Sequence, residues 1–187
     1  MKEGQTIEGW VVEEEKVLLK TSVATIKSGP VKCCRSGREK EFFLFDFPDW
    51  VNVVAVTPDN KLVMIRQFRY GSRRSEIEIP GGMIDPGEDP VTAACRELQE
   101  ETGYVGSAPA IIGKVCPNPA IQRNFCYTVL VRDVRKTTSR RLDEMEDIEC
   151  FLQSYEEVEV LVKNGTINHG LVLNALMFCS FSFSGRR

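Results

Sequence analysis

The most constraining feature of the sequence is a capped helix that carries an apolar stripe and a cluster of glutamates on different faces. Asp89 supplies an N-cap, Pro90 suits the first helical position, and Gly103 stands where the helix ends. At about 100° per residue, the three glutamates of this cluster fall within roughly 100° of one another. They are Glu97, Glu100 and Glu101. The residues on the other flank, which we expect to pack against a sheet, are Val91, Ala94, Cys95, Leu98 and Thr102.

Carboxylates at this spacing repel one another, at a cost of about 0.2–0.5 kcal/mol per pair on an exposed helix. Arg96 is the cation within the cluster, and Glu88, just before the helix, can fold back toward it. A hard divalent cation would offset the repulsion better, because Mg²⁺ and Mn²⁺ prefer carboxylate oxygens. The helix therefore suggests a metal site, although the charges taken alone also fit a solvated acidic face.

The N-terminal part of the chain is predicted to be β-rich. Short β-like pieces are expected at residues 10–12, 17–19, 23–26 and 41–45, with a turn at residues 28–30. Residues 46–49 are the predicted boundary. We therefore expect residues 1–45 to form an extension and residues 46–187 to form the main domain.

The main domain alternates strands and helices. A hairpin is expected from residues 50–56 and 61–68, with further strands at residues 76–79, 110–115, 125–133 and 148–152. Two helices are expected near residues 155–164 and 170–181. The run at residues 51–56 is almost continuously apolar, as in a strand buried on both faces. This order predicts an α/β fold of the α+β type, in which a mixed β-sheet is sandwiched between helices.

Charge and cysteine content restrict the class of protein. The net charge of −3 argues against broad binding to nucleic acid or to anionic membranes. No apolar run approaches the roughly 20 residues of a membrane helix, and the N-terminus shows no signal-peptide pattern. The seven cysteines lack zinc-type spacing and accompany a single histidine. We expect reduced thiols and a cytoplasmic location.

The glutamate helix belongs to a longer pattern. Gly82 is followed after five residues by Glu88 and, after seven more, by residues 96–103, which read RELQEETG. This pattern resembles the signature of the Nudix hydrolases, a loop-helix-loop that binds divalent metals and diphosphates. The next position, usually a bulky aliphatic residue, is Tyr104. The resemblance implies a Nudix-type fold, Mg²⁺ as cofactor with Mn²⁺ as a substitute, and catalytic roles for Glu101 and Arg96. The implied metal ligands are Gly81, Glu97, Glu100 and Glu101.

Segments outside the signature narrow the resemblance. Residues 67–69 (QFR), 78–82 (EIPGG) and 117–119 (PNP), followed by an acidic loop at 143–147, are similar to those of ADP-ribose pyrophosphatases and related nucleotide-sugar hydrolases. The implied substrate-binding residues are Arg69, Glu78, Gly81, Gly82 and Pro119. Glu78 resembles a residue that holds the glycine loop or reaches the substrate. Arg69 could instead form a surface salt bridge, and Pro119 could simply stiffen its loop; Ala120 replaces the usual glycine there.

The acidic loop holds the expected water-activating residue. In the subfamily a glutamate from a mobile loop orients or deprotonates the attacking water, and Glu144 is the matching residue, with Glu146 as second choice. A solvated loop without a catalytic role is the alternative. His169, which opens the last helix, is interpreted as structural.

The resemblance implies Mg²⁺-dependent hydrolysis of a nucleoside diphosphate sugar, with ADP-ribose giving AMP and ribose 5-phosphate. The alternatives are another nucleotide sugar such as GDP-mannose, a damaged nucleoside triphosphate, or a non-catalytic domain that senses a nucleotide sugar. Nucleic acid and membrane are not expected as partners. The β-rich extension resembles the part through which such enzymes form homodimers.

Overall fold

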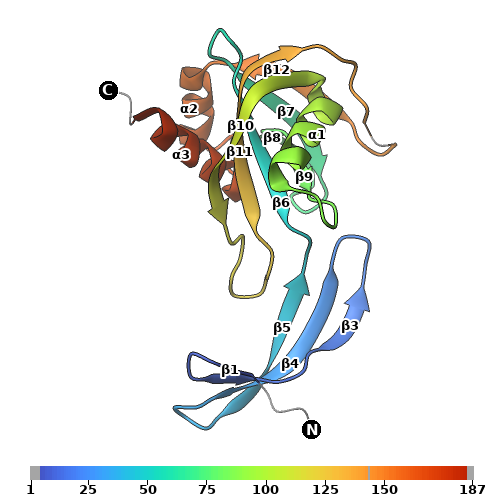
Figure 1. Ribbon diagram of the computed structural model, residues 1–187, viewed down its shortest axis with the longest axis vertical. Helices are drawn as coiled ribbons and strands as arrows, with labels where there is room; N and C mark the ends of the chain where they lie inside the picture. Colours follow the sequence, from blue (N-terminus) through green and yellow to red (C-terminus); the bar gives the residue numbers. More distant parts are fainter. Residues whose placement is uncertain (1–4, 143, 185–187) are drawn as a thin grey trace. The chain divides into compact units, whose positions relative to one another are not determined.

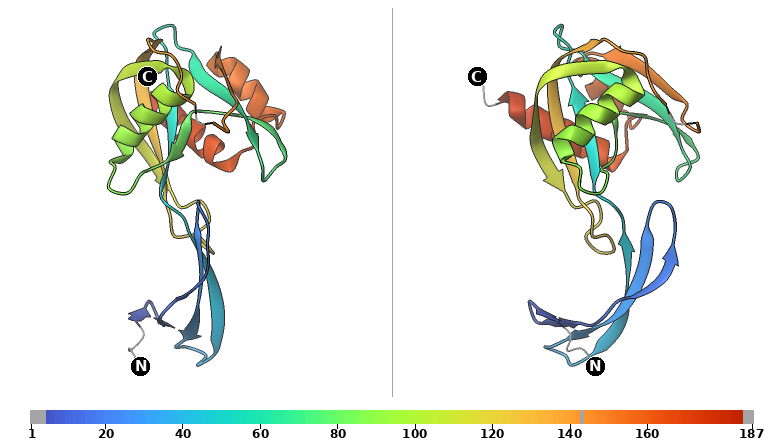
Figure 2. Two further views of the ribbon diagram at one scale, coloured as in Figure 1. Left: turned by 90° about the vertical axis from the view of Figure 1, so that its right-hand side faces the viewer. Right: turned by 45° about the vertical axis from the view of Figure 1, so that its right-hand side comes forward.

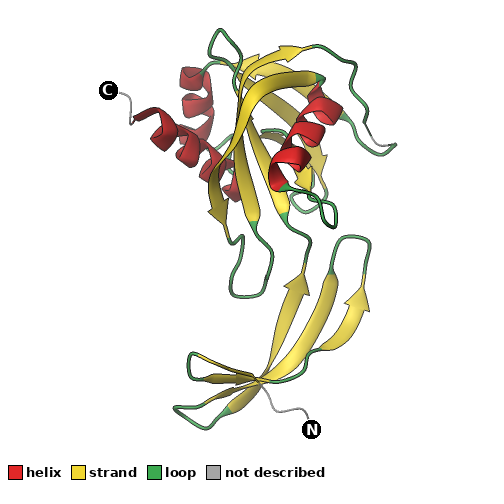
Figure 3. Ribbon diagram, viewed as in Figure 1, coloured by secondary structure: helices red, strands yellow, loops and turns green. Residues whose placement is uncertain are grey.

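The computed structural model describes residues 5–142 and 144–184, and the chain divides into two compact units. The first unit comprises residues up to Pro48 together with Cys116–Asn124, and the second comprises Asp49–Val115 together with residues from Phe125 onward. Figure 3 shows that the three helices of the described chain all belong to the second unit. The loop at Cys116–Asn124, which the sequence leaves in the main domain, groups with the first unit.

The first unit contains one antiparallel sheet. Its strands are β1 (Gln5–Ile7), β2 (Trp10–Val12), β3 (Lys16–Lys20), β4 (Thr25–Cys33) and β5 (Glu39–Asp46), and β4 pairs with β2, β3 and β5. The turn predicted at residues 28–30 is wrong, because these residues lie inside β4. On one side of β4 the partner changes from β3, paired at Ser28, to β2, paired at Val31. Pro30 falls between these partners, where its missing N–H group is not needed by the ladder.

The second unit is organised around a four-stranded mixed sheet. The strand order is β10 (Tyr104–Val115), β11 (Cys126–Lys136), β6 (Trp50–Ala55) and β9 (Gly81–Met83). Strand β6 is parallel to β11 and antiparallel to β9. Helix α1 (Pro90–Thr102) covers one face and α3 (Gly170–Ser184) the other (Figure 1). Figure 2 shows the same arrangement from two further directions. The predicted mixed sheet between helices is confirmed.

Strand β6 separates two hydrophobic clusters. Val53 packs in a cluster with Leu98 of α1, while Val54 packs in a cluster with Val172 of α3. Successive side chains of a strand point to opposite faces, so an uninterrupted apolar run is what a strand covered on both sides requires. The interpretation of this run as a doubly buried strand is therefore correct.

A three-stranded antiparallel sheet completes the second unit, with strand order β12 (Ile148–Gln153), β7 (Leu62–Arg69) and β8 (Arg74–Glu78), followed by helix α2 (Tyr155–Lys163). The predicted hairpin of β6 with β7 is wrong. The chain does turn back at Thr57, whose N–H donates to the carbonyl of Lys61, but β6 and β7 then join different sheets. Strands that are apolar on both faces need cover on both sides, and their sequence does not specify which strand lies beside them.

Helix α1 begins and ends as predicted. The Asp89 carboxylate accepts hydrogen bonds from two backbone N–H groups of the first turn, and Gly103 ends the helix at φ 76°. Cys95, predicted to face the sheet, is exposed. The buried face is rotated toward Glu101, and its members are Ala93, Ala94, Leu98, Glu101 and Thr102. One of the glutamates therefore lies on the side that packs against the sheet.

Within the described residues, no helix combines the length and apolarity that crossing a bilayer demands.

Candidate functional site

The site is built where helix α1 approaches strand β9. The side chain of Glu101 is 3% exposed, and its Oε2 accepts a hydrogen bond of 3.0 Å from the N–H of Gly81. A Cβ atom on Gly81 would lie 2.3 Å from the carbonyl oxygen of Val51, and one on Gly82 would lie 2.4 Å from a carboxylate oxygen of Glu97. Gly81 is therefore required by its close approach to the backbone of β6, whereas a larger residue at position 82 would displace the Glu97 carboxylate. Glu101 anchors the glycine strand to α1.

Arg96 holds three other carboxylates around one guanidinium group. Its Nε and Nη2 donate to Glu88 at 3.0 and 2.9 Å, and its Nη1 lies 2.8 Å from Glu97 Oε1 and 3.3 Å from Glu100 Oε2. Nη2 also donates to the carbonyl of Met83 at 3.1 Å, which connects this network to β9. The hydrogen bond with Glu88 is the largest influence that raises the pKa of Arg96. The side chain is thus a permanent cation that orders the acidic face.

The buried carboxylates lack sufficient positive charge. Burial is the main reason that the pKa of Glu101 is raised to about 8; the Gly81 N–H group lowers it, while the nearby charges of Glu97 and Glu146 raise it. Burial also raises the pKa of Glu97. Carboxyl groups in this condition either hold a proton or require a cation.

These groups line an open pocket of about 430 Å³. It brings together most of the residues that the sequence indicated, namely Arg69, Gly81, Gly82, Arg96, Glu97, Glu100 and Glu101. Gln67, Asp85 and Arg141 also line it and were not anticipated. The backbone N–H of Arg141 donates to the carbonyl of Glu100 at 2.9 Å, which brings the loop after β11 to the end of α1. In the sequence, the feature that could have indicated Arg141 is the adjacent basic pair Arg140 and Arg141 just before the acidic loop.

The acidic loop contributes Glu146 to this pocket. Glu146 lines the pocket and its charge acts on both Glu97 and Glu101, whereas Glu144 is exposed and is not part of the lining. Residue 143, the first of the acidic stretch, lies outside the described residues. The structure therefore places Glu146, the second choice from the sequence, with the other carboxylates, and leaves Glu144 outside the pocket.

Arg69 and Glu78 form a two-pronged ion pair. The Nε and Nη2 atoms of Arg69 each donate to one oxygen of Glu78 at 2.8 Å. Burial opposes ionisation of Glu78, but the bonds from Arg69 and the neighbouring His169 outweigh it and hold the pKa at about 2. Arg69 is held by a buried anion and remains part of the pocket wall, so it can still meet a bound anion.

Pro119 lies in the first unit, where it lines a pocket of about 340 Å³ together with residues of β4 and β5. Its assignment to the substrate remains a prediction.

The donor set of the acidic pocket fits a divalent cation. Glu97, Glu100 and Glu101 offer the hard oxygen ligands that such ions prefer, and two of them carry raised pKa values that a cation would relieve. Among the described residues no three side chains are already gathered as a metal-binding group. Arg96 ties Glu97 and Glu100 instead, so binding of the ion requires these carboxylates to turn from Arg96 toward Glu101.

Several known proteins are similar to this chain in sequence. The NUDIX domain family matches residues 47–176. The chain is 29% identical over 144 residues to the ADP-ribose pyrophosphatase of Bacillus subtilis (strain 168), covering 76% of this chain and 78% of that protein. It is 30% identical over 132 residues to the methanol dehydrogenase activator of Bacillus methanolicus, covering 70% and 71%.

A solved structure shows the same fold. The crystal structure of an ADP compounds hydrolase superposes with a TM-score of 0.84 over 97% of this chain and 98% of that one, at 20% sequence identity. The likeness concerns the fold alone.

Burial of Glu101 predicts an inverse dependence of stability on pH in the metal-free protein. The pKa of about 8 in the folded state lies above the ordinary value of 4.5. The folded protein therefore holds this proton more tightly than the unfolded chain, and the free energy of unfolding decreases as the pH rises from 4.5 to 8. The loss should amount to roughly 3–5 kcal/mol. Urea unfolding in EDTA at several pH values measures it. Glu101→Gln keeps an acceptor for Gly81 and should lack this part of the dependence, and Mn²⁺ should flatten the wild-type curve. Identical pH profiles for the two proteins would contradict the assignment.

Proposed function

Because this chain belongs to the Nudix hydrolase family, we propose that it hydrolyses the diphosphate bond of a nucleoside diphosphate sugar, with ADP-ribose converted to AMP and ribose 5-phosphate. Within the family, this substrate class is supported by the Bacillus subtilis relative, which is an ADP-ribose pyrophosphatase. The yeast relative of the same name, from Saccharomyces cerevisiae, is 37% identical over 99 residues, which cover 50% of this chain and 42% of that protein.

One observation carries the proposal: the carboxylates of α1 and the cation Arg69 line the same open pocket. A diphosphate carries negative charge along its length, so it needs a bridging cation on the carboxylate side and a fixed cation elsewhere. Arg69 is fixed by Glu78, and Arg141 adds a second guanidinium to the lining. The pocket therefore matches a diphosphate better than it matches a neutral ligand.

Glu97, Glu100 and Glu101 would hold the divalent ion, with the carbonyl of Gly81 as a further ligand, and we propose Mg²⁺ as the ion used. When bound, such an ion neutralises the diphosphate and lowers the pKa of coordinated water. Without the ion, Arg96 holds Glu97 and Glu100, and Gly82 leaves room for the Glu97 carboxylate.

The proposed chemistry transfers a phosphoryl group to water. The oxygen of a water molecule bonds to one phosphorus atom while the bond from that atom to the bridging oxygen breaks, which leaves two monophosphates. Arg69 and Arg141 stabilise negative charge on the phosphates, and Glu146 orients the water and accepts its proton. Positioning and charge neutralisation are the main requirements of this reaction, so no covalent nucleophile is needed.

The non-catalytic alternative is less well supported. The relative from Bacillus methanolicus is a methanol dehydrogenase activator, and its name is what suggests this alternative. In this chain Glu97, Glu100 and Glu101 are all present and clustered, and a sensor would not need them. GDP-mannose remains the rival substrate within the same chemistry.

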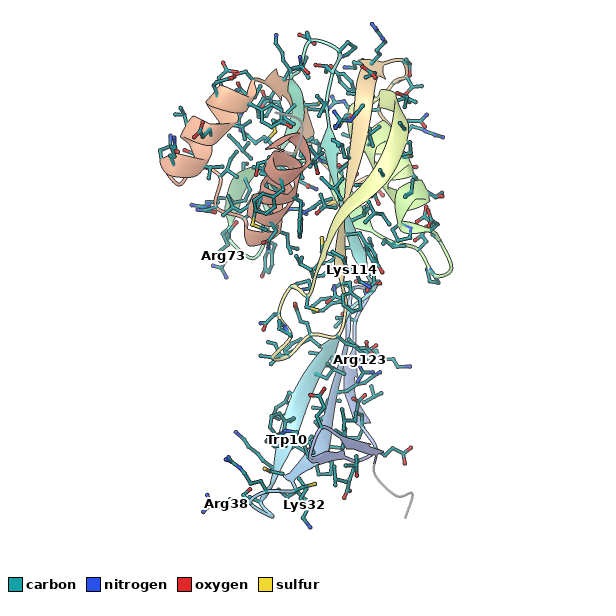
Figure 4. All side chains as sticks on the ribbon, turned by 60° about the vertical axis from the view of Figure 1, so that its left-hand side comes forward. Trp10, Lys32, Arg38, Arg73, Lys114 and Arg123 are labelled. Carbon is teal, nitrogen blue, oxygen red and sulfur yellow. The ribbon has the colours of Figure 1, made fainter. Side chains whose placement is uncertain are left out.

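We further propose that the first unit mediates homodimerisation and that the enzyme works in the cytoplasm. Several large apolar side chains of its sheet are exposed, including Ile7, Trp10, Leu19, Phe42 and Phe43. Figure 4 shows Trp10 among the side chains of this sheet. Ile7, Trp10 and Phe42 line one pocket, and exposed apolar side chains that gather in this way mark an interaction site. Sedimentation velocity tests the proposal, and a monomer at micromolar concentration would contradict it.

The reaction is tested with the purified chain, Mg²⁺ and a panel of ADP-ribose, GDP-mannose and ATP in ¹⁸O-labelled water. We expect AMP and ribose 5-phosphate, with the label in one of them by mass spectrometry, and a kcat/KM for ADP-ribose that exceeds the others. Removal of metal with EDTA should lower turnover by at least about 100-fold, and added Mg²⁺ should restore it. Absence of cleavage with both Mg²⁺ and Mn²⁺ would overturn the proposed function.

The acidic loop offers a matched pair of variants. Glu146→Gln should lower kcat by about 100-fold or more, because it removes a proton acceptor from the pocket while keeping size and polarity. Glu144→Gln, two residues away on the exposed side of the same loop, should keep a rate close to that of the wild type. Steady-state kinetics with ADP-ribose measure both. The reverse order would assign the role to Glu144.

A further inference from the structure

A second, smaller pocket of about 170 Å³ adjoins the acidic one. The two share part of their lining, namely Arg69, Gly81, Gly82 and Met83. The smaller pocket is otherwise formed by β6, by the end of β8 and by the start of α3, with Trp50, Glu78, His169 and Leu171 among its lining residues. A group bonded directly to a diphosphate in the acidic pocket would enter this space.

The wall of this pocket contains the ion pair of Arg69 and Glu78 and, beside it, a histidine that the proposed chemistry does not use. Glu78 is 3% exposed and receives both prongs of Arg69 at 2.8 Å. On its other side, Nδ1 of His169 lies 3.3 Å from Oε2 of Glu78. The contact does not have the geometry of a hydrogen bond, so this buried Nδ1 has no hydrogen-bond partner among the described residues, and the Glu78 carboxylate is the ionic partner that it faces. We therefore regard Glu78 as the group that orients the imidazole.

This contact determines which ring nitrogen is available to a ligand. A carboxylate that receives both prongs of an arginine is ionised and can only accept hydrogen bonds. A proton on Nδ1, the nitrogen that faces this carboxylate, is therefore the favourable arrangement, because a lone pair there would face the anion. In the neutral imidazole, Nε2 then keeps a lone pair and is an acceptor. An acceptor complements an O–H or N–H group and repels a phosphate oxygen.

We propose that His169 is a specificity-determining residue whose Nε2 accepts a hydrogen bond from a hydroxyl group of the sugar ring bonded directly to the diphosphate. The inference rests on the proposed function and extends it. The pocket is below the usual size of a site for a whole ligand and suits a single ring. Because this pocket shares a wall with the acidic pocket, the ring that enters it is the one nearest the phosphates. In ADP-ribose this ring is a ribose at both ends of the diphosphate.

The first test uses the fact that His169 is the chain's one histidine, so its imidazole signals need no assignment. In ¹⁵N-labelled protein at pH 8, long-range ¹H–¹⁵N spectra should show Nδ1 protonated and Nε2 unprotonated. An ADP-ribose analogue with a methylene bridge between the phosphorus atoms should then shift the Nε2 signal. Protonation on Nε2 in the free protein, or an unmoved signal when calorimetry shows the analogue bound, would overturn the inference.

The second test is kinetic and identifies the ring. His169→Phe should raise KM for ADP-ribose roughly 3- to 10-fold, the effect of one neutral hydrogen bond, with kcat nearly unchanged. His169→Gln, which retains an acceptor, should recover part of the loss. Two further substrates each lack the hydroxyls of one ring. The ADP ester of cyclopentylmethanol lacks those of the terminal ribose, and the 2′,3′-dideoxyadenosine form of ADP-ribose lacks those of the adenosine ribose. The penalty should vanish for the one whose missing hydroxyls His169 contacts.

An equal penalty on all three substrates, or a fall in kcat at constant KM, would show a structural role and reject the inference. Thermal unfolding of both variants separates misfolding from altered recognition, and the spectra of the wild-type protein do not depend on any variant. If wild-type protein neither binds nor cleaves ADP-ribose, the proposed function itself has failed. Normal wild-type cleavage with unaffected variants rejects only the role of His169.

Discussion

The site depends on a buried carboxylate that holds a glycine strand against a helix. Glu101 accepts the N–H of Gly81, and this one backbone donor is a small compensation for a charge that is 3% exposed. A buried charge without sufficient neutralisation costs several kcal/mol. The fold therefore leaves a need for positive charge at the point where α1 meets β9. The same contact that joins these two elements creates the demand that a divalent cation would meet.

Arg96 explains how such an acidic surface can exist in the folded protein. Its guanidinium group bonds to Glu88, Glu97 and Glu100, so the carboxylates next to Glu101 are neutralised from the protein side. Glu101 receives no such bond and keeps the raised pKa. Arg96 thus orders the exposed acidic face of α1, while Glu101, the most buried of these acids, has no cation of the chain bonded to it.

The second buried carboxylate near the glycine strand, that of Glu78, differs from Glu101 because its pKa is lowered and not raised. Glu78 is buried but ionised, because Arg69 reaches it with two hydrogen bonds, and His169 approaches its second oxygen. Gly81 has space for a hydrogen atom only, since a Cβ there would meet the carbonyl oxygen of Val51, and a Cβ on Gly82 would displace the Glu97 carboxylate. A diphosphate bound in this pocket would therefore meet both the carboxylates that can hold a metal ion and the guanidinium group of Arg69.

Patterns of neighbouring residues were sufficient to predict the local elements. Caps and periodicity identified α1 with its glutamates, the apolar run identified the doubly buried β6, and the signature identified the glycine strand, because each depends on residues close together in the chain. Three features became visible only in the folded domain: β6 and β7 join different sheets, Glu146 rather than Glu144 lines the pocket, and Glu78 pairs with Arg69 beside His169. These outcomes depend on which surfaces pack together across long separations in the chain, and packing is a property of the whole domain that no local pattern contains.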